Sequence, residues 1–377
     1  MDKSIKIRVQ SIKSVFHHAK QATMQIQNLV RKNIQNLKPY SSARSEFSGT
    51  ASVFLDANEN GHDLFGEALN RYPDPLQLAV KQRIAKLKGI PVESIFLGNG
   101  SDEAIDLLFR IFCEPGVDEA ITCPPTYGMY RVQADIHGTP IRQVLLTEDF
   151  QLRPQAMLEA ASPNTKLLFL CSPNNPTGNL LDPAAIEFLL RYFQGIVVVD
   201  EAYIDFAEGT KSWSQRLAEF PNLVVLQTLS KAWALAGARL GMAFASPEII
   251  HYLNTVKSPY NVGLPTQRAV LSAFETGLDG TVSTIIAERK RLEIAGVGFD
   301  FVEKIYPSDA NFLLIKMEDS ALIFNYLKQN GVVVRDRSRE PLCEGCLRIT
   351  VGTPSENDRL LALMAAFNSS TIQSSNP

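Results

Sequence analysis

The sequence predicts an α/β fold with a mostly parallel, buried sheet, followed by a smaller α+β unit. Short apolar runs rich in β-branched residues alternate with helical patterns in the middle of the chain, which is typical of βαβ units. The chain has 377 residues, enough for two or three domains of about 150 residues each. Because 45% of the residues are apolar, a large core can be buried.

The predicted strands and helices follow from the local pattern. Strands are expected at Glu119–Cys123, Lys166–Cys171, Ile196–Asp200, Leu223–Gln227 and Gly241–Ala245, with helices between several of them, such as Asp102–Phe112 and Pro183–Tyr192. A long charged stretch from about Thr281 to Ile305 is expected to be a helix that bridges two domains. The α+β unit follows, with strands at Phe312–Met317, Val332–Arg335 and Leu347–Val351 and helices at Ser320–Gln329 and Ser355–Phe367.

Composition and charge exclude several classes of protein. The chain carries 37 Lys and Arg against 40 Asp and Glu, so nothing indicates a general nucleic-acid or membrane surface. The longest apolar runs, Leu167–Cys171 and Ile196–Val199, are far shorter than the roughly 18–20 residues of a membrane helix. Collagen, coiled coils, long disordered chains and integral membrane proteins are therefore excluded.

Both ends of the chain differ from the rest. Residues 1–23 carry five basic residues against one acid, with apolar residues at helical spacing. They are either a targeting or interaction helix or, as we favour, an extension without a role. The Ser- and Asn-rich tail after Asn368 is expected to be disordered.

The five cysteines are too few for a disulfide scaffold. Their odd number and the lack of a signal-peptide pattern predict a reducing compartment, the cytoplasm. Cys343 and Cys346 form a lone C-x-x-C pair without a nearby His, so we favour a structural role over a redox or zinc site and expect no metal.

Two loops are candidates for ligand binding. Gly98–Glu103 leads into a helix, which predicts either a phosphate seat at the helix N-terminus or a helix start capped by Ser101 or Asp102. Ser172–Gly178 follows a strand, at the sheet edge where ligands bind in parallel sheets. Its Asn residues either bind a ligand oxygen or satisfy their own turn.

Two charged residues stand in apolar surroundings. Asp200 ends a run of four apolar residues, which is costly unless the carboxylate meets a cation, caps a helix or pairs with an Arg. Lys231 lies among Leu, Ala and Trp residues, which lowers the pKa of its amine and suits Schiff-base chemistry. Ser230 and Arg239 on either side of it can hold a phosphate.

Taken together, these segments resemble a known family. Asn174–Gly178, Asp200–Tyr203 and Ser230–Trp233, with Asp200 placed 31 residues before Lys231, are similar to the fold-type I pyridoxal-phosphate aminotransferases. Within that family the histidinol-phosphate aminotransferases are most similar, on the segments Asn36–Arg44, Leu55–Asn60, Arg71–Pro75, Cys123–Tyr130 and Leu347–Thr353. The resemblance covers about Val30 to Phe367 and departs at Gly61, where the family more often has Pro.

The resemblance implies a fold-type I architecture, in which a large domain holds a mostly parallel seven-stranded sheet between helices. We expect an extension (1–23), an N-terminal arm (24–60), the large cofactor-binding domain (61–280), a small α+β domain (281–368) and a disordered tail (369–377). It also implies a homodimer with shared active sites, in which Tyr72 reaches the cofactor phosphate of the neighbouring subunit.

The resemblance implies pyridoxal 5′-phosphate as cofactor and assigns its contacts. Lys231 would bind it covalently and move a proton, while Asp200 would face the pyridine nitrogen. Asn175 and Tyr203 would bind its phenolic oxygen, and Tyr127 would stack on its ring. The phosphate would be held by Ser230, Arg239, the backbone at Ser101 and Asp102, and Thr228.

The implied reaction is transamination between histidinol phosphate and 2-oxoglutarate, giving imidazole acetol phosphate and glutamate in histidine biosynthesis. Arg348 and Arg335 would bind the phosphate or carboxylate of the substrates. Tyr40 and Tyr260 would close over the substrate, and Asn58 would contact it.

Four alternatives stay open to different degrees. Threonine-phosphate decarboxylases and aromatic-amino-acid aminotransferases share the same motifs. A ligand sensor with a DNA-binding head would need some 60–70 residues before the match, where only about 23 stand. A dinucleotide-dependent oxidoreductase would need a G-x-G-x-x-G motif after a first strand.

Overall fold

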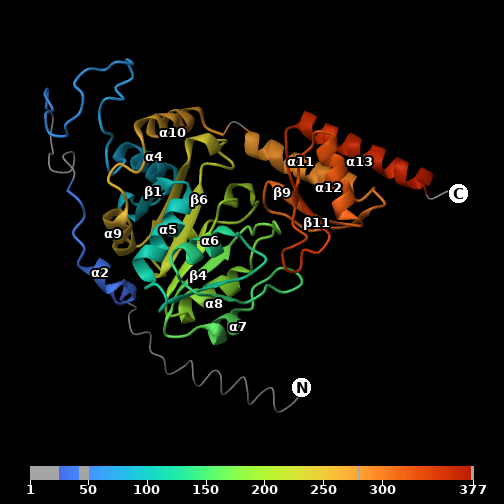
Figure 1. Ribbon diagram of the computed structural model, residues 1–377, viewed down its shortest axis with the longest axis horizontal. Helices are drawn as coiled ribbons and strands as arrows, with labels where there is room; N and C mark the ends of the chain where they lie inside the picture. Colours follow the sequence, from blue (N-terminus) through green and yellow to red (C-terminus); the bar gives the residue numbers. More distant parts are fainter. Residues whose placement is uncertain (1–24, 42–50, 279, 375–377) are drawn as a thin grey trace, which may run out of the picture.

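The computed structural model describes residues 25–41, 51–278 and 280–374. The predicted extension, residues 42–50 of the predicted arm, and the last three residues of the predicted tail lie outside the described residues. Two bodies lie side by side, a larger one up to about α10 and a smaller one from α11 onward (Figure 1). None of the helices in the described part is long and apolar enough to cross a membrane.

The larger body is a seven-stranded sheet in the order β1-β7-β6-β5-β4-β2-β3. Its strands are β1 (Ile95–Asn99), β2 (Glu119–Thr122), β3 (Ile141–Gln143), β4 (Thr165–Cys171), β5 (Ile196–Asp200), β6 (Leu223–Thr228) and β7 (Leu240–Ala245). All pairings are parallel except those of β7, which runs antiparallel to β6 and β1. The connection from β6 to β7 contains no crossover helix, so the chain returns antiparallel.

Helices cover both faces of this sheet. On one face, the apolar side chains of the strands pack with α5 (Ser101–Phe112), α6 (Met129–Ile136) and α9 (Pro247–Val256). On the other, they pack with α4 (Leu78–Lys88), α7 (Pro154–Ala160), α8 (Pro183–Tyr192) and α10 (Leu264–Thr276). Burial on both faces explains why β4, β5 and β6 are continuous apolar runs.

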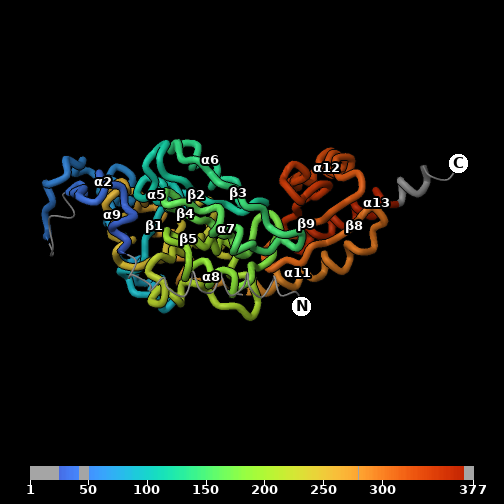
Figure 2. The backbone as a smooth tube through the Cα atoms, turned by 90° about the horizontal axis from the view of Figure 1, so that it is seen from below, coloured from blue at the N-terminus to red at the C-terminus, as the bar shows by residue number. Residues whose placement is uncertain are grey.

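The chain before the sheet packs only in part. Ile26 in η1 (Ile26–Leu29), Val30, and Ile34 in α2 (Lys32–Gln35) are buried against the helices of the first face. Both views place this segment at the end of the molecule away from the smaller body (Figures 1 and 2). Farther along, Leu55, Leu64 and Phe65 are each more than 70% exposed, which leaves an apolar strip on the surface.

The smaller body is an antiparallel sheet in the order β10-β11-β9-β8. Its strands are β8 (Val302–Ile305), β9 (Phe312–Met317), β10 (Arg335–Asp336) and β11 (Cys346–Thr350), and its helices are α11 (Thr281–Gly296), α12 (Ser320–Gln329) and α13 (Pro354–Ser374). The helices cover one face, where Leu313, Leu347 and Ile349 are buried. The other face turns toward the large sheet, since Leu314 and Cys346 belong to the core of the larger body.

Three predictions for this part were wrong in detail. The helix expected at 281–305 ends at Gly296, and residues 302–305 form strand β8 instead, whose Ile305 side chain packs close against Gly296. The strand expected at 332–335 is β10 (Arg335–Asp336), which starts three residues later and ends one residue later. The last helix runs to Ser374, into the tail expected to be disordered, since no Gly or Pro interrupts 355–374. The boundary predicted between residues 280 and 281 coincides with the start of α11 and stays a prediction.

Candidate active site

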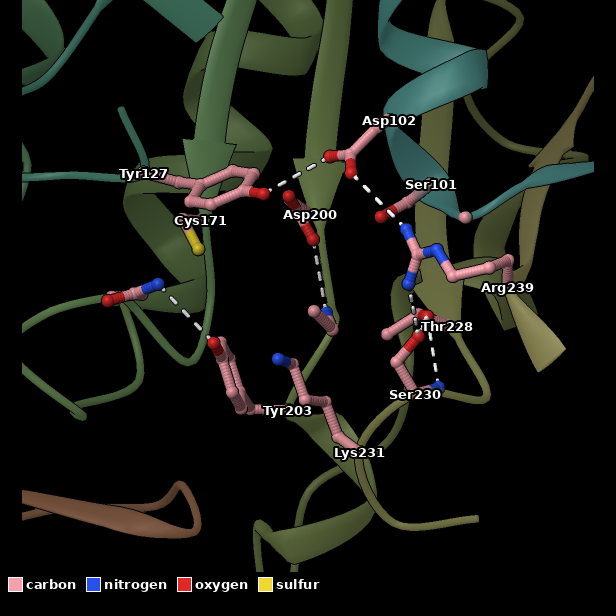
Figure 3. Close-up of a pocket in the computed structure, with 13 residues that line it drawn as sticks. Ser101, Asp102, Tyr127, Cys171, Asp200, Tyr203, Thr228, Ser230, Lys231 and Arg239 are labelled. Carbon is pink, nitrogen blue, oxygen red and sulfur yellow. Dashed lines mark hydrogen bonds and ion pairs between the residues drawn. The ribbon is translucent and has the colours of Figure 1, made fainter. Parts of the chain in front are cut away.

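A cavity of about 540 Å³, partly open to solvent, lies at the carboxyl ends of β4, β5 and β6. The described residues that line it are Gly100, Ser101, Asp102, Tyr127, Cys171, Asn175, Asp200, Ala202, Tyr203, Thr228, Ser230, Lys231 and Arg239. Ten of these were predicted from the sequence as cofactor-binding or catalytic residues. Arg239, Ser101, Thr228 and Ser230 gather on one side of the cavity, with Tyr127 and Tyr203 on the other (Figure 3).

The cavity floor is the carboxylate of Asp200, the last residue of β5. It is 2% exposed and forms no ion pair among the described residues. Its Oδ2 accepts a 2.7 Å hydrogen bond from the Tyr130 hydroxyl, and its Oδ1 accepts one of 3.1 Å from the Ala202 amide. Burial raises the pKa of Asp200 to about 6, against the effect of both hydrogen bonds. The predicted helix cap and Arg pair are thus absent from the described contacts, and the carboxylate suits a cationic ligand group.

Lys231 projects into the same cavity, with its Nζ 5.6 Å from the centroid of the Tyr203 ring. Desolvation lowers the pKa of the Lys231 amine, and the positive charge of Arg348 lowers it further. The apolar neighbours of Lys231 in the sequence affect this pKa less directly than we expected, because Leu229 and Ala232 are buried in separate core clusters. An amine with a lowered pKa is a better nucleophile at neutral pH.

The start of α5 forms an anion seat. The helix has Gly100 as its N-cap, and no side chain caps its first turn, so the predicted cap by Ser101 or Asp102 is wrong. Free N–H groups and the positive helix end therefore face the cavity. A Cβ on Gly100 would lie 2.7 Å from Arg239 Nη2, so glycine is required where this loop meets the arginine.

Arg239 completes this seat from the loop before β7. Its Nη1 donates to Ser230 Oγ at 3.4 Å, and its Nη2 lies 3.6 Å from Asp102 Oδ2. Thr228 Oγ1 donates to Ser230 Oγ at 3.0 Å, and the Tyr127 hydroxyl donates to Asp102 Oδ1 at 3.1 Å. Hydroxyls, an arginine and a helix N-terminus together are the donor set that a phosphate group needs.

The sequence left open whether the asparagines of the loop after β4 bind a ligand or satisfy their own turn. In the structure, Asn174 and Asn175 each take one of these roles. Asn174 satisfies the loop itself, donating to Pro125 O at 2.9 Å and to Thr177 Oγ1 at 2.8 Å. Asn175 faces the cavity, where its Nδ2 donates to the Tyr203 hydroxyl at 3.3 Å and its Oδ1 accepts a 2.6 Å hydrogen bond from Arg348 Nη1. Arg348, on β11, thus approaches the cavity from the smaller body.

The pyridoxal phosphate predicted from the resemblance fits this arrangement. The anion seat, the buried carboxylate and the lysine occupy separate sides of one cavity, matching a phosphate, a protonated ring nitrogen and an aldehyde. Such a ligand explains two features of the cavity. Position 100 has no side chain, where a Cβ would crowd Arg239, and the buried Asp200 carboxylate has no ion pair among the described residues. No group of three or more metal-ligating side chains occurs in the ranges that the structure describes.

Other predicted residues lie outside this cavity. Tyr72 and Tyr260 are partly exposed and stack on each other, with ring centroids 4.4 Å apart. Asn58 lines a separate surface hollow with Tyr72, and Tyr40 is 76% exposed. Arg335 is exposed and pairs with Arg348 across β10 and β11. Their roles stay predictions.

Sequence reasoning missed three residues at or near the site, Tyr130, Arg337 and Cys171. Tyr130 binds Asp200 from α6, 70 residues away, and Arg337 follows β10 close to Arg348. Tyr130 stood in a segment that carried the resemblance, but nothing local linked it to Asp200. Cys171, also not predicted, lines the cavity with a buried thiol.

Comparisons with known proteins agree with this geometry. The family model for class I and II aminotransferases matches residues 45–363. A histidinol-phosphate aminotransferase from Parabacteroides distasonis is 55% identical over 341 residues, 90% of this chain and 98% of that protein. The structure of the histidinol-phosphate aminotransferase from Clostridium acetobutylicum has a TM-score of 0.74 at 20% identity, covering 80% of this chain and 92% of that one.

A second solved structure shares the fold and contains the cofactor. The histidinol-phosphate aminotransferase from Sinorhizobium meliloti, in complex with pyridoxal-5′-phosphate, has a TM-score of 0.71 at 23% identity, covering 79% of this chain and 83% of that one. These two structures support the fold alone, whereas the family model and the 55% identical relative decide membership. The chain belongs to the class I and II aminotransferase family and, within it, to the histidinol-phosphate aminotransferases.

Proposed function

We propose that the protein uses pyridoxal 5′-phosphate for the reversible transfer of the amino group between histidinol phosphate and 2-oxoglutarate, which interconverts them with imidazole acetol phosphate and glutamate in histidine biosynthesis. The observation that carries the proposal is the placement of the Lys231 amine and the Asp200 carboxylate in one cavity with an anion seat (Figure 3). The choice of substrate is supported by the 55% identical relative of that name.

The cofactor, when bound, supplies an aldehyde that condenses with amines and a ring that accepts electrons from the substrate's α-carbon. In this arrangement Ser230, Arg239 and the first turn of α5 hold its phosphate, with Thr228 supporting Ser230. Asp200 keeps a proton on the ring nitrogen, and Tyr130 and the Ala202 amide keep Asp200 ionised.

Lys231 and its neighbours handle the reacting end. The lowered pKa of the Lys231 amine allows it to bind the aldehyde and, once released, to move a proton from the substrate's α-carbon. Asn175 and Tyr203 are hydrogen-bonded to each other and donate toward the phenolic oxygen. Tyr127, which lines the cavity, would pack on the face of the ring. Arg348 binds the substrate's anionic group, with Arg335, Tyr40, Tyr260 and Asn58 as further predicted contacts.

A homodimer with shared sites is part of the proposal. Tyr72 is half exposed and lies outside the cavity of its own chain, as expected if it serves a second copy. The exposed Leu55, Leu64 and Phe65 precede it and offer an apolar surface for that copy. We also place the protein in the cytoplasm, because all five cysteines are free and buried.

Spectroscopy and a coupled assay test this function. Protein loaded with pyridoxal phosphate should absorb near the visible edge, and this band should be lost on treatment with borohydride and absent in Lys231→Ala. Glutamate should form from histidinol phosphate and 2-oxoglutarate, and Asp200→Asn should retain cofactor but lose most turnover. A protein that cannot be loaded would refute the cofactor. Carbon dioxide release from threonine phosphate, with no glutamate formed from histidinol phosphate, would indicate a threonine-phosphate decarboxylase instead.

A further inference from the structure

Three arginines share one face of the small sheet. Arg335 lies directly opposite Arg348 in the antiparallel pair of β10 and β11. The Arg337 amide donates to Cys346 O at 2.9 Å, which extends the same ladder beyond β10. Because side chains two positions apart on a strand point to the same face, Arg337 lies on the side of Arg335 and Arg348.

That face is turned toward the candidate active site. Leu314, the register partner of Arg348 on β9, and Cys346 are both buried in the core of the larger body. Arg348 contacts Asn175 at 2.6 Å, and its guanidinium carbon is 5.3 Å from the centroid of the Phe312 ring. Phe312 in turn meets the ring of Tyr203, which lines the cavity, at 5.1 Å.

Arg337 has an unused hydrogen-bond donor in this setting. Its side chain is only 19% exposed, and its Nε is inaccessible to solvent and has no hydrogen-bond partner among the described residues. Among the described residues its one carboxylate contact is Glu340, 3.5 Å from Nη1 and three residues along the chain. Buried donors are almost always satisfied in native proteins, so Arg337 keeps a hydrogen-bonding capacity that its described neighbours do not use.

The charges around Arg337 indicate that a ligand that uses this capacity is an anion. Its positive charge lowers the pKa of Arg348 more than that of Arg335 does, and it also lowers the pKa of Tyr203. Arg348 forms no ion pair with a carboxylate in the described part of the chain. Two neighbouring guanidinium groups repel each other, and an anion bound between them removes that cost.

We propose that Arg337 binds the phosphate group of the substrate together with Arg348 and so favours a phosphorylated amine over an amino acid that carries only carboxylates. This rests on the proposed function. A carboxylate has two oxygens and one charge, which a single guanidinium fork satisfies. A phosphate monoester has three free oxygens and a charge near −2 at neutral pH, which engage two such forks.

The test separates the two substrates of one enzyme. In Arg337→Gln, KM for histidinol phosphate should rise about tenfold or more, while KM for glutamate and kcat change less than about twofold. Arg337→Lys should fall in between, since a lysine keeps the charge but loses the fork. The matched control is Arg339→Gln, an exposed arginine two residues along, which should leave both KM values unchanged.

A binding measurement and a second variant complete the design. Calorimetric titration of inorganic phosphate into the cofactor-loaded protein should show weaker binding in Arg337→Gln than in the wild type and in Arg339→Gln. Glu340→Gln should leave KM for histidinol phosphate unchanged or lower it, because it removes the carboxylate that pairs with Arg337 in the described part of the chain.

Two results would overturn the inference: equal rises of both KM values in Arg337→Gln, or the same defect in Glu340→Gln, which would mark a structural pair. A wild-type enzyme that forms no glutamate from histidinol phosphate would instead refute the proposed function. The phosphate titration would still decide whether Arg337 binds phosphate.

Discussion

The hydroxyl of Tyr130 donates a 2.7 Å hydrogen bond to Oδ2 of Asp200, and both side chains are buried. Tyr130 is itself held in place by Phe169, whose ring is stacked on it with a centroid distance of 4.7 Å. The hydrogen bond lowers the pKa of Asp200 and so works against the desolvation that raises it. Tyr130 is therefore a positioning residue for the carboxylate on which the cofactor's ring depends.

Replacing Tyr130 by Phe should weaken catalysis without emptying the site. A hydrogen bond to a charged group contributes about 1.5–3 kcal/mol, so kcat should fall roughly tenfold or more. The lost bond raises the pKa of Asp200, so the acid side of the kcat–pH profile should move to higher pH. Tyr252→Phe, another buried tyrosine in the same core cluster, is the control. An unshifted profile would show that Tyr130 only fills space.

The cofactor-free protein should lose stability as the pH rises through the titration of Asp200. Its pKa is raised from 3.8 to about 6, so between these values the folded state binds more protons than the unfolded state. The free energy of unfolding therefore falls with rising pH over that window and stays lower above it. In Asp200→Asn, the decrease of the free energy of unfolding over this pH range should be smaller by about 2 kcal/mol.

Urea unfolding of both cofactor-free proteins at about pH 4 and pH 7 measures this difference. Glu201, whose pKa burial raises to about 7, is present in both proteins, so its own effect cancels in the comparison. If the free energy of unfolding changes equally between the two pH values in the wild type and in Asp200→Asn, the Asp200 carboxyl is not desolvated.

Gly241 should be required for the anion seat. A Cβ at this position of β7 would overlap the backbone of Gly100 and Ser101, where α5 begins. Gly241→Ala should push the two segments apart, weaken pyridoxal phosphate binding about tenfold or more, and lower the Tm. Gly237→Ala, which meets nothing within 4 Å, is the matched control. Unchanged cofactor affinity in Gly241→Ala would place the phosphate elsewhere.

Mixing two inactive variants tests the shared active site. If Tyr72 serves the neighbouring subunit, a heterodimer of Lys231→Ala and Tyr72→Phe contains one site with both native residues. Random exchange of subunits then restores about a quarter of the wild-type activity. The activity of the mixture is compared with the mean of the two separate variants. If mass spectrometry confirms that the subunits have exchanged and the activity does not rise, Tyr72 acts in the site of its own chain.

Local patterns in the sequence were enough to predict many of the helices and strands and most of the residues that line the cavity. The strand Ile196–Asp200 and the helices Pro183–Tyr192 and Ser320–Gln329 have the predicted bounds, because apolar periodicity and capping residues act over a few neighbours. The helix at Pro183 shows this directly, since the Asp182 side chain accepts a hydrogen bond from the Ala184 amide. The family motifs are equally local, which is why ten cavity residues could be named in advance.

Which distant side chains meet depends on the tertiary structure. The sequence cannot show that Tyr130 binds Asp200, that strand β8 returns against Gly296, or that Arg337 shares a face with Arg348. Each of these depends on packing between segments tens of residues apart, and their residue types alone allow many other partners. The small sheet packs against the large one, and this packing brings together the residues that carry the chemistry.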